Sequence, residues 1–339
     1  MDWFERLTGF RETGYDDTRR KLKVEGRELH SLVNYKSYGI GELELVSLHS
    51  LRERVKSATN SSGRLKVSVV SGDVRAMHSL PENAGALFQV ASQFNLLEML
   101  GPSVTPEHGV TRYEHDRTQG PACAIAAGAA TIYRNYFAPV GNALGQTKDR
   151  QLDGLADLGQ ALSETLSQPI ENLWRMENGY ATCSRAGLEA IRAHLGSLGQ
   201  RERDALRGLL RIGLHSDVEV TDARGAHGQL VSQAFCSALP VAYGRTVADA
   251  VHWESFATLI LQAAYEATLC AAVLNAERGA SNVVLLTRLG GGAFGNNDDW
   301  IHGAMRRALE MARGHDLDVK LVSYGVPSRE IVQMAKDFG

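Results

Sequence analysis

Hydrophobic and polar positions follow two spacings along this chain, and each spacing predicts a different kind of element. Apolar residues at helical spacing predict amphipathic helices over 256–274 and 301–312. Alternation predicts a hairpin or a pair of strands within 22–48, followed by a short helix over 51–60. Short apolar runs rich in β-branched residues predict buried strands at 65–70, 86–92, 217–221, 230–239, 282–289 and 318–323.

The order of these elements predicts the fold class. Strands that alternate with helices indicate helical crossovers between parallel strands, so we expect a three-layer α/β/α fold with a mixed, mainly parallel central sheet. Residues 148–212 carry several short helical patterns and are expected to form a helical insertion. We expect residues 1–60 to form an N-terminal extension and residues 61–339 to form the main domain.

Composition narrows the class of protein. The 339 residues are 44% hydrophobic and 22% charged, with a net charge of −3 and no basic block. We therefore expect a cytoplasmic protein that binds neither nucleic acid nor membrane. The four cysteines form no CxxC pair and the eleven histidines lack metal-ligand spacing. We expect buried, reduced thiols, no metal and no cofactor.

A glycine-rich loop carries the sharpest chemical signal. Residues 289–297 follow the predicted strand at 282–289 and precede a predicted helix. Glycines let the backbone turn tightly and approach a ligand closely, and free N–H groups before a helix form an anion site. A phosphate or diphosphate is the expected ligand, and a plain tight turn is the alternative.

The same loop matches the G-x-G-x-x-G dinucleotide fingerprint, but the chain that follows does not suit that fold. A Rossmann unit needs an acidic residue near the end of the next strand. Here the strand at 318–323 is followed by Tyr324 and Gly325, and only about 14 residues remain, which is too few for further βαβ units. Earlier segments must therefore hold the rest of the nucleotide.

Two earlier segments carry a family resemblance. Residues 69–74, with Gly72, Asp73 and Val74, resemble the opening of a macrodomain, where a strand ends in Gly-Asp-Ile or Gly-Asp-Val. Residues 86–95 resemble the strand that ends in the macrodomain signature Val-Asn-Ala-Ala-Asn, although that signature is not literal here. Residues 292–295 resemble the diphosphate-gripping loop, especially in the poly(ADP-ribose) glycohydrolase branch.

This resemblance covers roughly residues 65–135 and 215–325, judged by the order of elements. It implies a macrodomain-like catalytic domain and extends to a divergent group whose members include bacterial effectors that remove ADP-ribose from modified arginine. No cofactor is implied. The implied partners are ADP-ribose and an ADP-ribosylated protein.

The resemblance also implies roles for single positions. Asp73 would accept a hydrogen bond from the adenine amino group beside the Val74 backbone, and Phe94 and Asn95 would lie by the distal ribose. Phe294 would cover the ligand. The uncharged helix start at Gln119 and Gly120 could also meet a phosphate. The loop residues expected to bind the diphosphate are Gly290, Gly291, Gly292, Ala293, Phe294, Gly295 and Asn296.

Carboxylates near these segments are candidates for the chemistry. Cleavage at ribose C1 develops positive charge, which a carboxylate can stabilise or relieve by activating water. Asp298 and Asp299 follow the glycine loop, and Asp116 lies in the loop before Pro121. The alternatives are helix capping for the first two and a solvated loop for Asp116. Glu98, on the segment after Asn95, is a weaker candidate, and a surface helix acid is the favoured alternative for it.

These observations predict an ADP-ribosyl hydrolase that removes mono-ADP-ribose from protein side chains, with arginine as the favoured linkage. A poly(ADP-ribose) glycohydrolase and a non-catalytic reader of ADP-ribose are the alternatives. A third alternative is an interaction protein in which the insertion at 148–212 docks a partner.

Overall fold

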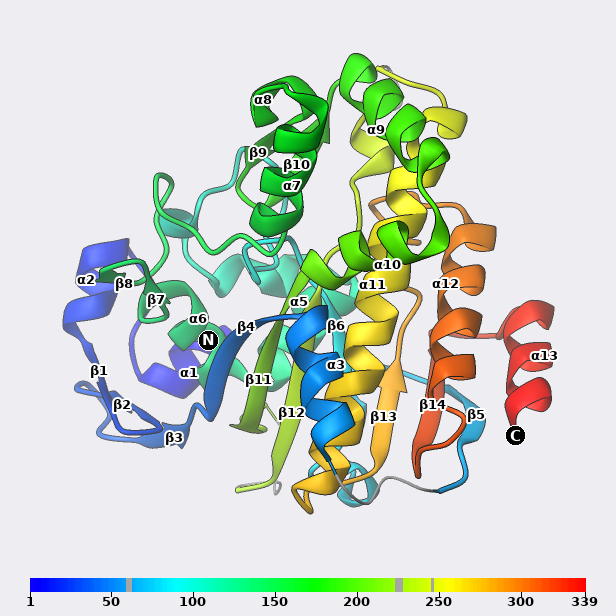
Figure 1. Cartoon of the computed structure of the whole chain (residues 1–339). Helices are drawn as coiled ribbons and strands as arrows, with labels where there is room; N and C mark the ends of the chain where they lie inside the picture. The colour runs from blue at the N-terminus through cyan, green and yellow to red at the C-terminus, as the bar shows by residue number, and fades with distance from the viewer. Residues whose placement is uncertain (59–62, 223–227, 245–246) are drawn as a thin grey trace.

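A seven-stranded mixed sheet forms the centre of the protein (Figure 1). The computed structural model describes residues 1–58, 63–222, 228–244 and 247–339. Across the sheet the strand order is β4-β11-β12-β6-β13-β14-β5. The strands are β4 (Glu42–Ser47), β5 (Lys66–Ser71), β6 (Leu87–Ala91), β11 (Arg211–Glu219), β12 (Leu230–Cys236), β13 (Val283–Leu286) and β14 (Asp318–Ser323).

Most of the sheet is parallel, as predicted. Strands β12, β6, β13, β14 and β5 pair in parallel, and only β11 runs antiparallel to its neighbours. The carboxyl ends of these five strands therefore meet at one edge. In open α/β sheets this edge is where ligands bind.

Helices cover both faces of the sheet, which confirms the three-layer prediction. Alternate side chains of β13 show the arrangement: Val284 and Leu286 belong to one core cluster, and Leu285 belongs to another. The first face carries α3 (Leu48–Ser57), α10 (Gln200–Leu209), α11 (Ala250–Glu277), α12 (Asp298–Met311) and α13 (Arg329–Phe338). The second face carries α4 (Val74–Met77), α5 (Gln119–Ala126) and α6 (Gly128–Tyr136).

The N-terminal segment packs beside α6 as a small unit with its own core. It contains α1 (Trp3–Thr8), α2 (Tyr15–Arg20) and a three-stranded sheet of β1 (Leu22–Glu25), β2 (Glu28–Ser31) and β3 (Ser37–Gly39). This confirms the predicted hairpin. Strand β4 also lies within residues 1–60, yet it pairs with β11, so the main sheet already includes part of that segment.

The insertion is helical, but it also contains a hairpin that the sequence analysis missed. Helices α7 (Ala156–Leu166), α8 (Ile170–Leu173) and α9 (Arg185–Ser197) surround β9 (Trp174–Glu177) and β10 (Tyr180–Cys183). Strand β11 begins at Arg211, six residues before the predicted start at 217. Polar residues such as His215 interrupt its apolar pattern, although His215 is buried between sheet and helices.

Shorter elements complete the connections. A hairpin of β7 (Pro139–Val140) and β8 (Ala143–Leu144) precedes the insertion. Helix α5 begins at Gln119, two residues before Pro121, and α13 had no counterpart in the sequence analysis. The 3-10 turns are η1 (Pro81–Asn83), η2 (Pro106–His108), η3 (Thr111–His115) and η4 (Val241–Gly244).

Helix α11 is the central helix of the first face (Figure 1). By length and composition it could cross a membrane, which the sequence analysis did not expect, but 78% of its apolar window is buried in the fold. Such burial is typical of the core helix of a globular domain. Cys123, Cys183 and Cys236 are buried free thiols, as predicted, and Cys270 on α11 is partly exposed.

Candidate functional site

A cleft of about 140 Å³ opens at the carboxyl ends of β6 and β13, where the insertion also reaches the sheet. Its walls come from the loop after β6, the start of α5 and the glycine loop after β13. The predicted residues that line it are Asp116, Gln119, Gly120, Gly290, Gly292, Ala293 and Phe294. The cleft thus joins the three segments that the sequence analysis selected separately.

The glycine loop is held in a conformation that leaves backbone donors free. Gly290 has φ of 73°, and a Cβ there would lie 2.5 Å from the Ala238 Cβ, so only glycine fits. Asn296 braces the turn by donating from Nδ2 to the Leu239 and Gly290 carbonyls at 2.9 and 3.2 Å. Within the described chain, the N–H groups of residues 292–294 donate no hydrogen bond. Such a run of free N–H groups suits an anion.

The start of α5 is fixed against the end of β6. Gln119 accepts from the Ala91 N–H at 2.7 Å and donates to the Gln89 carbonyl at 2.8 Å. A Cβ on Gly120 would lie 2.0 Å from the Ala91 carbonyl oxygen, so the helix can approach this closely only with glycine there. Gln119 therefore extends the edge of β6 and sets the position of the helix start beside the cleft.

Glu98 is a buried residue that lines the cleft, so the favoured alternative of a surface acid is wrong. It is 2% exposed, lines the cleft, and its carboxylate lies 3.4 Å from the Arg134 guanidinium. Burial raises the pKa of Glu98 to about 7, although Arg134 opposes the shift. The carboxyl group can therefore be protonated near neutral pH, as a general acid requires.

Asp116 supplies a second carboxyl group to the cleft. Its Oδ1 accepts from the Thr118 N–H at 2.8 Å, which fixes the turn before α5. The Tyr113 hydroxyl, one turn earlier, accepts from the Glu98 N–H at 3.1 Å. The two acids therefore sit on segments that contact each other directly.

The N-terminal segment braces this loop. Glu12 accepts from the N–H groups of Val110 and Thr111 at 3.0 and 2.7 Å, and from the Tyr136 hydroxyl at 2.6 Å. These bonds fix the start of η3, the turn that ends at Asp116. Charged hydrogen bonds of this kind hold a loop more firmly than neutral ones. The extension thus contributes to the geometry of the cleft.

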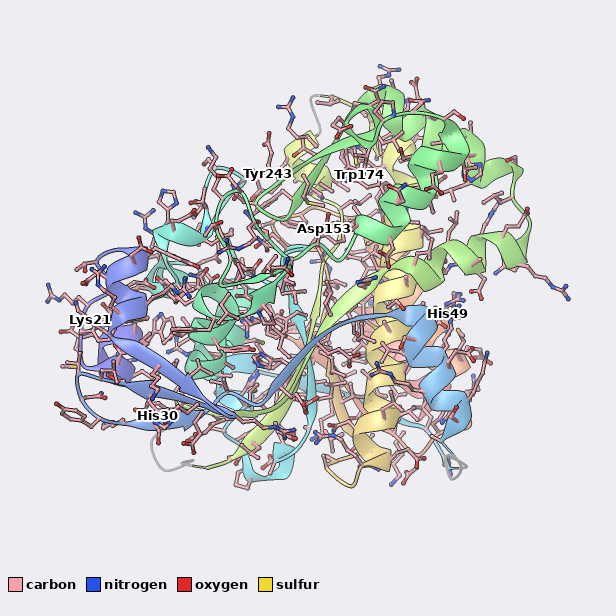
Figure 2. All side chains as sticks on the ribbon, turned by 60° about the vertical axis from the view of Figure 1, so that its left-hand side comes forward. Lys21, His30, His49, Asp153, Trp174 and Tyr243 are labelled. Atoms are coloured by element: carbon pink, nitrogen blue, oxygen red, sulfur yellow. The ribbon has the colours of Figure 1, made fainter. Side chains whose placement is uncertain are left out.

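Three aromatic side chains form one wall of the cleft. Tyr180 of β10 lies 5.3 Å from Phe294 and 5.4 Å from Tyr243 between ring centroids, and Tyr243 lies 6.0 Å from Phe294. The Tyr180 hydroxyl donates to the Met99 carbonyl at 2.7 Å. Figure 2 shows Tyr243 at the end of the molecule that carries the insertion and Trp174. The insertion therefore contributes a side chain to the site.

Asp298 lies beside the cleft rather than in it. Its Oδ1 is 2.6 Å from Nε of Arg288, and Arg288 lines the cleft at the base of the glycine loop. Asp299 is exposed in the first turn of α12, where its backbone N–H donates to the Asn297 side chain at 2.8 Å. In the described structure neither acid lines the cleft. Catalysis by either remains a prediction.

The remaining predicted residues do not line the cleft in the described structure: Asp73, Val74, Phe94, Asn95, Gly291, Gly295 and Asn296. Asp73 is exposed after β5 and accepts from the Arg75 N–H at 2.9 Å, with Val74 buried beside it. Phe94 is buried in the core. The Asn95 amide donates to Gln151 at 2.8 Å and accepts from the Leu97 N–H at 3.1 Å. These partners occupy the Asn95 side chain, and no ligand-facing role is visible for it in the described structure.

The sequence analysis ranked Glu98 only as a weaker candidate, and it did not select Arg288 or the two tyrosines. Glu98 stands inside the apolar run 96–100, and this isolation among apolar residues was a usable sign of burial. Arg288 immediately precedes the glycine loop, so its position was also informative. Tyr180 and Tyr243 come from segments distant in sequence, and no local pattern pointed to them. Within the described chain, no group of three or more His, Cys, Asp or Glu side chains could hold a metal ion.

Comparison with known proteins gives distant likenesses only. No family model matches the chain, and no curated protein matches it in sequence. The structure is similar to poly(ADP-ribose) glycohydrolase from Deinococcus radiodurans in complex with ADP-ribose, at 13% identity and a TM-score of 0.44, covering 87% of this chain and 92% of that one. It is also similar to the enzyme from Thermomonospora curvata, at 11% identity and a TM-score of 0.45, covering 96% of both chains. With scores this low, the function must be argued from the residues of this chain.

Proposed function

We propose that this protein binds ADP-ribose at the cleft and hydrolyses the bond between ribose C1 and a modified protein side chain. The observation that carries the proposal is the position of Glu98. A buried carboxyl group that titrates near pH 7 opens into the same cleft as the free N–H groups of the glycine loop. A proton donor beside an anion site suits cleavage of a glycosidic bond in a phosphorylated sugar.

The order of the strands supports a binding position in which ADP-ribose lies along the edge of the sheet. From β6 to β5 there are three inter-strand steps, through β13 and β14, or about 14 Å. Asp73 follows β5, and Tyr324, with 91% of its surface exposed, follows β14. The adenine would lie toward Asp73 and Tyr324, the diphosphate at the glycine loop and Arg288, and the reacting ribose in the cleft. A cleft of about 140 Å³ holds only part of the ligand.

Glu98 and Asp116 have different roles in the proposed reaction. Glu98, protonated, donates its proton to the departing nitrogen or oxygen as the bond to C1 breaks. Asp116, ionised, stabilises the positive charge at C1 and accepts a proton from the attacking water. The products are free ADP-ribose and the unmodified side chain. Asp116 then releases to solvent the proton that it took from water, and Glu98 takes up a proton from solvent, so both groups return to their starting states.

The aromatic wall supports an arginine substrate. A guanidinium group stacks favourably on Tyr and Phe rings, and this attraction is worth about 0.5–2 kcal/mol. Tyr180, Tyr243 and Phe294 provide such faces beside Asp116, whose carboxylate suits a cation. The same wall could stack on a second adenosine of poly(ADP-ribose), so the linkage has to be tested.

The experiment is to measure release of free ADP-ribose by the full chain. The substrates are proteins mono-ADP-ribosylated on arginine, serine or glutamate, with poly(ADP-ribose) alongside. Release from arginine alone supports the full proposal, and release from poly(ADP-ribose) alone selects the glycohydrolase alternative. Binding of ADP-ribose without release from any substrate selects the reader, and absence of binding contradicts the proposal.

Asp298→Asn is expected to weaken substrate binding without removing the chemistry. The substitution takes the anion away from Arg288, whose guanidinium then loses its fixed position near the diphosphate. We expect KM to rise by about 1.4- to fivefold with kcat nearly unchanged, because an exposed pair contributes about 0.2–1 kcal/mol. Asp299→Asn is the matched control from the same helical turn. A large fall in kcat for either variant would instead place that acid in catalysis.

A further inference from the structure

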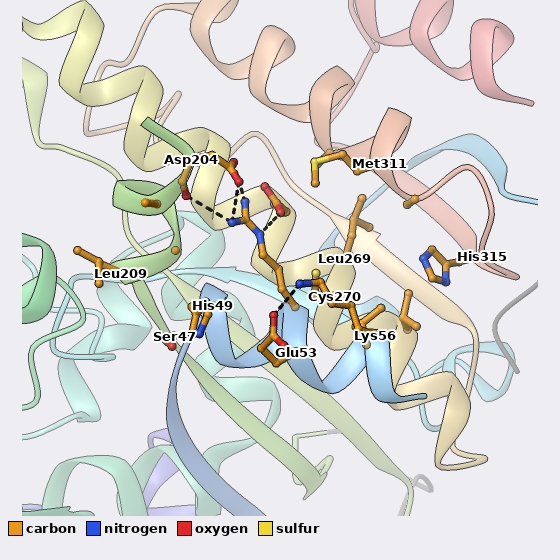
Figure 3. Close-up of a pocket in the computed structure, with 18 of the residues that line it drawn as sticks. Ser47, His49, Glu53, Lys56, Asp204, Leu209, Leu269, Cys270, Met311 and His315 are labelled. Carbon is orange, nitrogen blue, oxygen red and sulfur yellow. Dashed lines mark hydrogen bonds and ion pairs between the residues drawn. The ribbon is translucent and has the colours of Figure 1, made fainter. Parts of the chain in front are cut away.

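A second, larger cavity lies on the opposite side of α11 from the sheet. It is a groove of about 960 Å³ between α3 and α12, with the end of α10 across one end (Figure 3). Leu269, Cys270 and Val273 of α11 form its floor, and Met311 of α12 forms part of its wall. Along α3 it extends from Ser47 to Lys56, or about 14 Å. This volume lies within the range of about 300–1,000 Å³ found for small-molecule sites.

The groove exists because small residues occupy positions where large ones would close it. The groove is lined by Ala205 and Gly208 of α10, by Ala308 of α12 and by Ala312 directly after α12. Helices α3 and α12 both pack on α11, on either side of the gap (Figure 1). Apolar surface in a groove of this size is costly in water, and an apolar ligand would relieve that cost.

A network of ion pairs around the buried Glu266 connects the helices that line the groove. Glu266, 2% exposed, accepts from Arg52 at 2.5 Å and from Arg307 at 2.6 Å. Asp204 of α10 pairs with the same two arginines at 2.9 and 3.2 Å. These bonds fix α3, α10, α11 and α12 relative to one another. The groove is therefore formed before a ligand arrives, which lowers the entropic cost of binding.

The other carboxylates on the groove wall are also neutralised within the fold. Glu53 pairs with Lys56 at 2.6 Å, and Asp157 pairs with Arg211 at 2.6 Å. No lining carboxylate of the described chain is left without a cationic partner. A cationic ligand would have to break one of these pairs to gain an anion of its own.

Some nitrogen-bearing side chains of the groove have no partner among the described residues and can contact a ligand. Arg201 lines the groove at the α10 end, and its side chain makes no ion pair or hydrogen bond with any described residue. His49 lies near that end, and His315 lies at the opposite end (Figure 3). The buried Nδ1 of His315 has no hydrogen-bond partner among the described residues. Arg201 is thus a cation of the groove with no carboxylate partner among the described residues, and such a side chain suits an anionic ligand.

We propose that this groove is a binding site for a small anionic amphiphile, such as an aliphatic carboxylate. The hydrocarbon chain lies on Leu269, Cys270 and Val273, and the carboxylate lies at the α10 end near Arg201. The site is separate from the cleft at the strand ends and does not depend on the function proposed for that cleft.

The first test is calorimetry of the full chain with sodium hexanoate, octanoate and decanoate. Each added methylene is expected to tighten binding about fourfold until the groove is filled, because burial of a CH₂ contributes about 0.8 kcal/mol. Decyltrimethylammonium, with a chain of the same length and the opposite charge, is expected to bind at least tenfold more weakly than decanoate. Absence of decanoate binding, or equal affinity for both ions, overturns the proposal.

Variants locate the site. Cys270→Trp fills the floor and is expected to abolish decanoate binding, whereas Val251→Trp, at an exposed position of the same helix, leaves it unchanged. If Cys270→Trp does not fold, Met311→Trp at the 50% exposed rim serves instead. Arg201→Glu is expected to weaken binding about fivefold and the exposed α9 variant Arg192→Glu not at all. Unchanged binding in both the tryptophan and Arg201 variants overturns the assignment.

Discussion

Replacing Glu98 by glutamine is expected to reduce kcat for ADP-ribose release by about 10²–10⁴-fold, the usual contribution of a positioned proton donor. Glutamine has nearly the same shape as the protonated carboxyl group but has no acidic proton to give. Binding of ADP-ribose, measured by calorimetry, is expected to remain within about threefold, because the anion site on residues 292–294 is untouched. Wild-type turnover in this variant would remove Glu98 from the mechanism.

The control is chosen from the same region of the chain. Glu114→Gln changes an exposed acid on η3 that does not line the cleft in the described structure, so it should leave kcat unchanged. Glu98→Gln should be compared at pH 6, where the native carboxyl group is largely protonated and the two side chains are most alike. At this pH the Arg134 side chain meets a largely neutral group in both proteins, so the substitution changes its electrostatic surroundings least.

The pH profile separates a proton donor from a merely structural acid. Since the pKa of Glu98 is about 7, the protonated form and hence kcat should fall as pH rises through 7. The pKa of Glu98 in the folded protein lies above the ordinary value of 4.5, so this group also contributes stability that is fully present below pH 4.5. That stability is lost as pH rises toward and through 7. Glu98→Gln should remove this dependence from both activity and stability.

Gly292→Ala is expected to weaken ADP-ribose binding by about ten- to a hundredfold while leaving the fold intact. A Cβ at Gly292 meets no atom of the protein within 4 Å, so the substitution adds no internal clash. It does place a methyl group at the cleft wall, where the backbone must approach the diphosphate closely. Calorimetry with ADP-ribose, together with thermal melting, separates loss of binding from loss of stability.

Two further glycine variants serve as controls for the effects of Gly292→Ala on binding and on stability. Gly303→Ala, in the middle of α12 with open space around its Cβ, should keep full binding and stabilise the helix by about 0.5–1 kcal/mol. Gly290→Val should lower the melting temperature as well as binding, because its Cβ would meet Ala238 at 2.5 Å in a left-handed backbone conformation. If Gly292→Ala binds ADP-ribose like the unmodified chain, the loop is only a turn.

The site residues that could be predicted are those that belong to short, continuous stretches of the sequence. Gly290 and Gly295 indicate a loop between strand and helix, because both have a positive φ and such a backbone conformation favours glycine. The small-residue start of α5 at Gln119 and Gly120 was found in the same way. Asp116 could be placed near this start because it is only three residues away, and the structure puts it in the cleft.

Asp298 shows where local reasoning failed to settle a role. Two acids directly after a glycine loop fit catalysis and helix capping equally well at the level of sequence. In the structure Asp298 points to Arg288, ten residues earlier, and outside the cleft. Side-chain direction at a helix start depends on which partner lies across the loop, and that partner is fixed only when the loop has folded.

The sequence by itself determined the layers of this protein. Apolar residues at two spacings predicted the strands and helices, because the spacing that buries one face of an element is present within that segment. The alternation of strands and helices along the chain then implied the mixed, mainly parallel sheet. Only the tertiary structure decided what lies in the cleft and the groove. Glu98 became a buried acid because Arg134 and Tyr113, 36 and 15 residues away, enclose it, and Tyr180 reached Phe294 from a separate insertion. Burial, pKa and convergence of side chains depend on distant segments meeting, and no short stretch of sequence records that meeting.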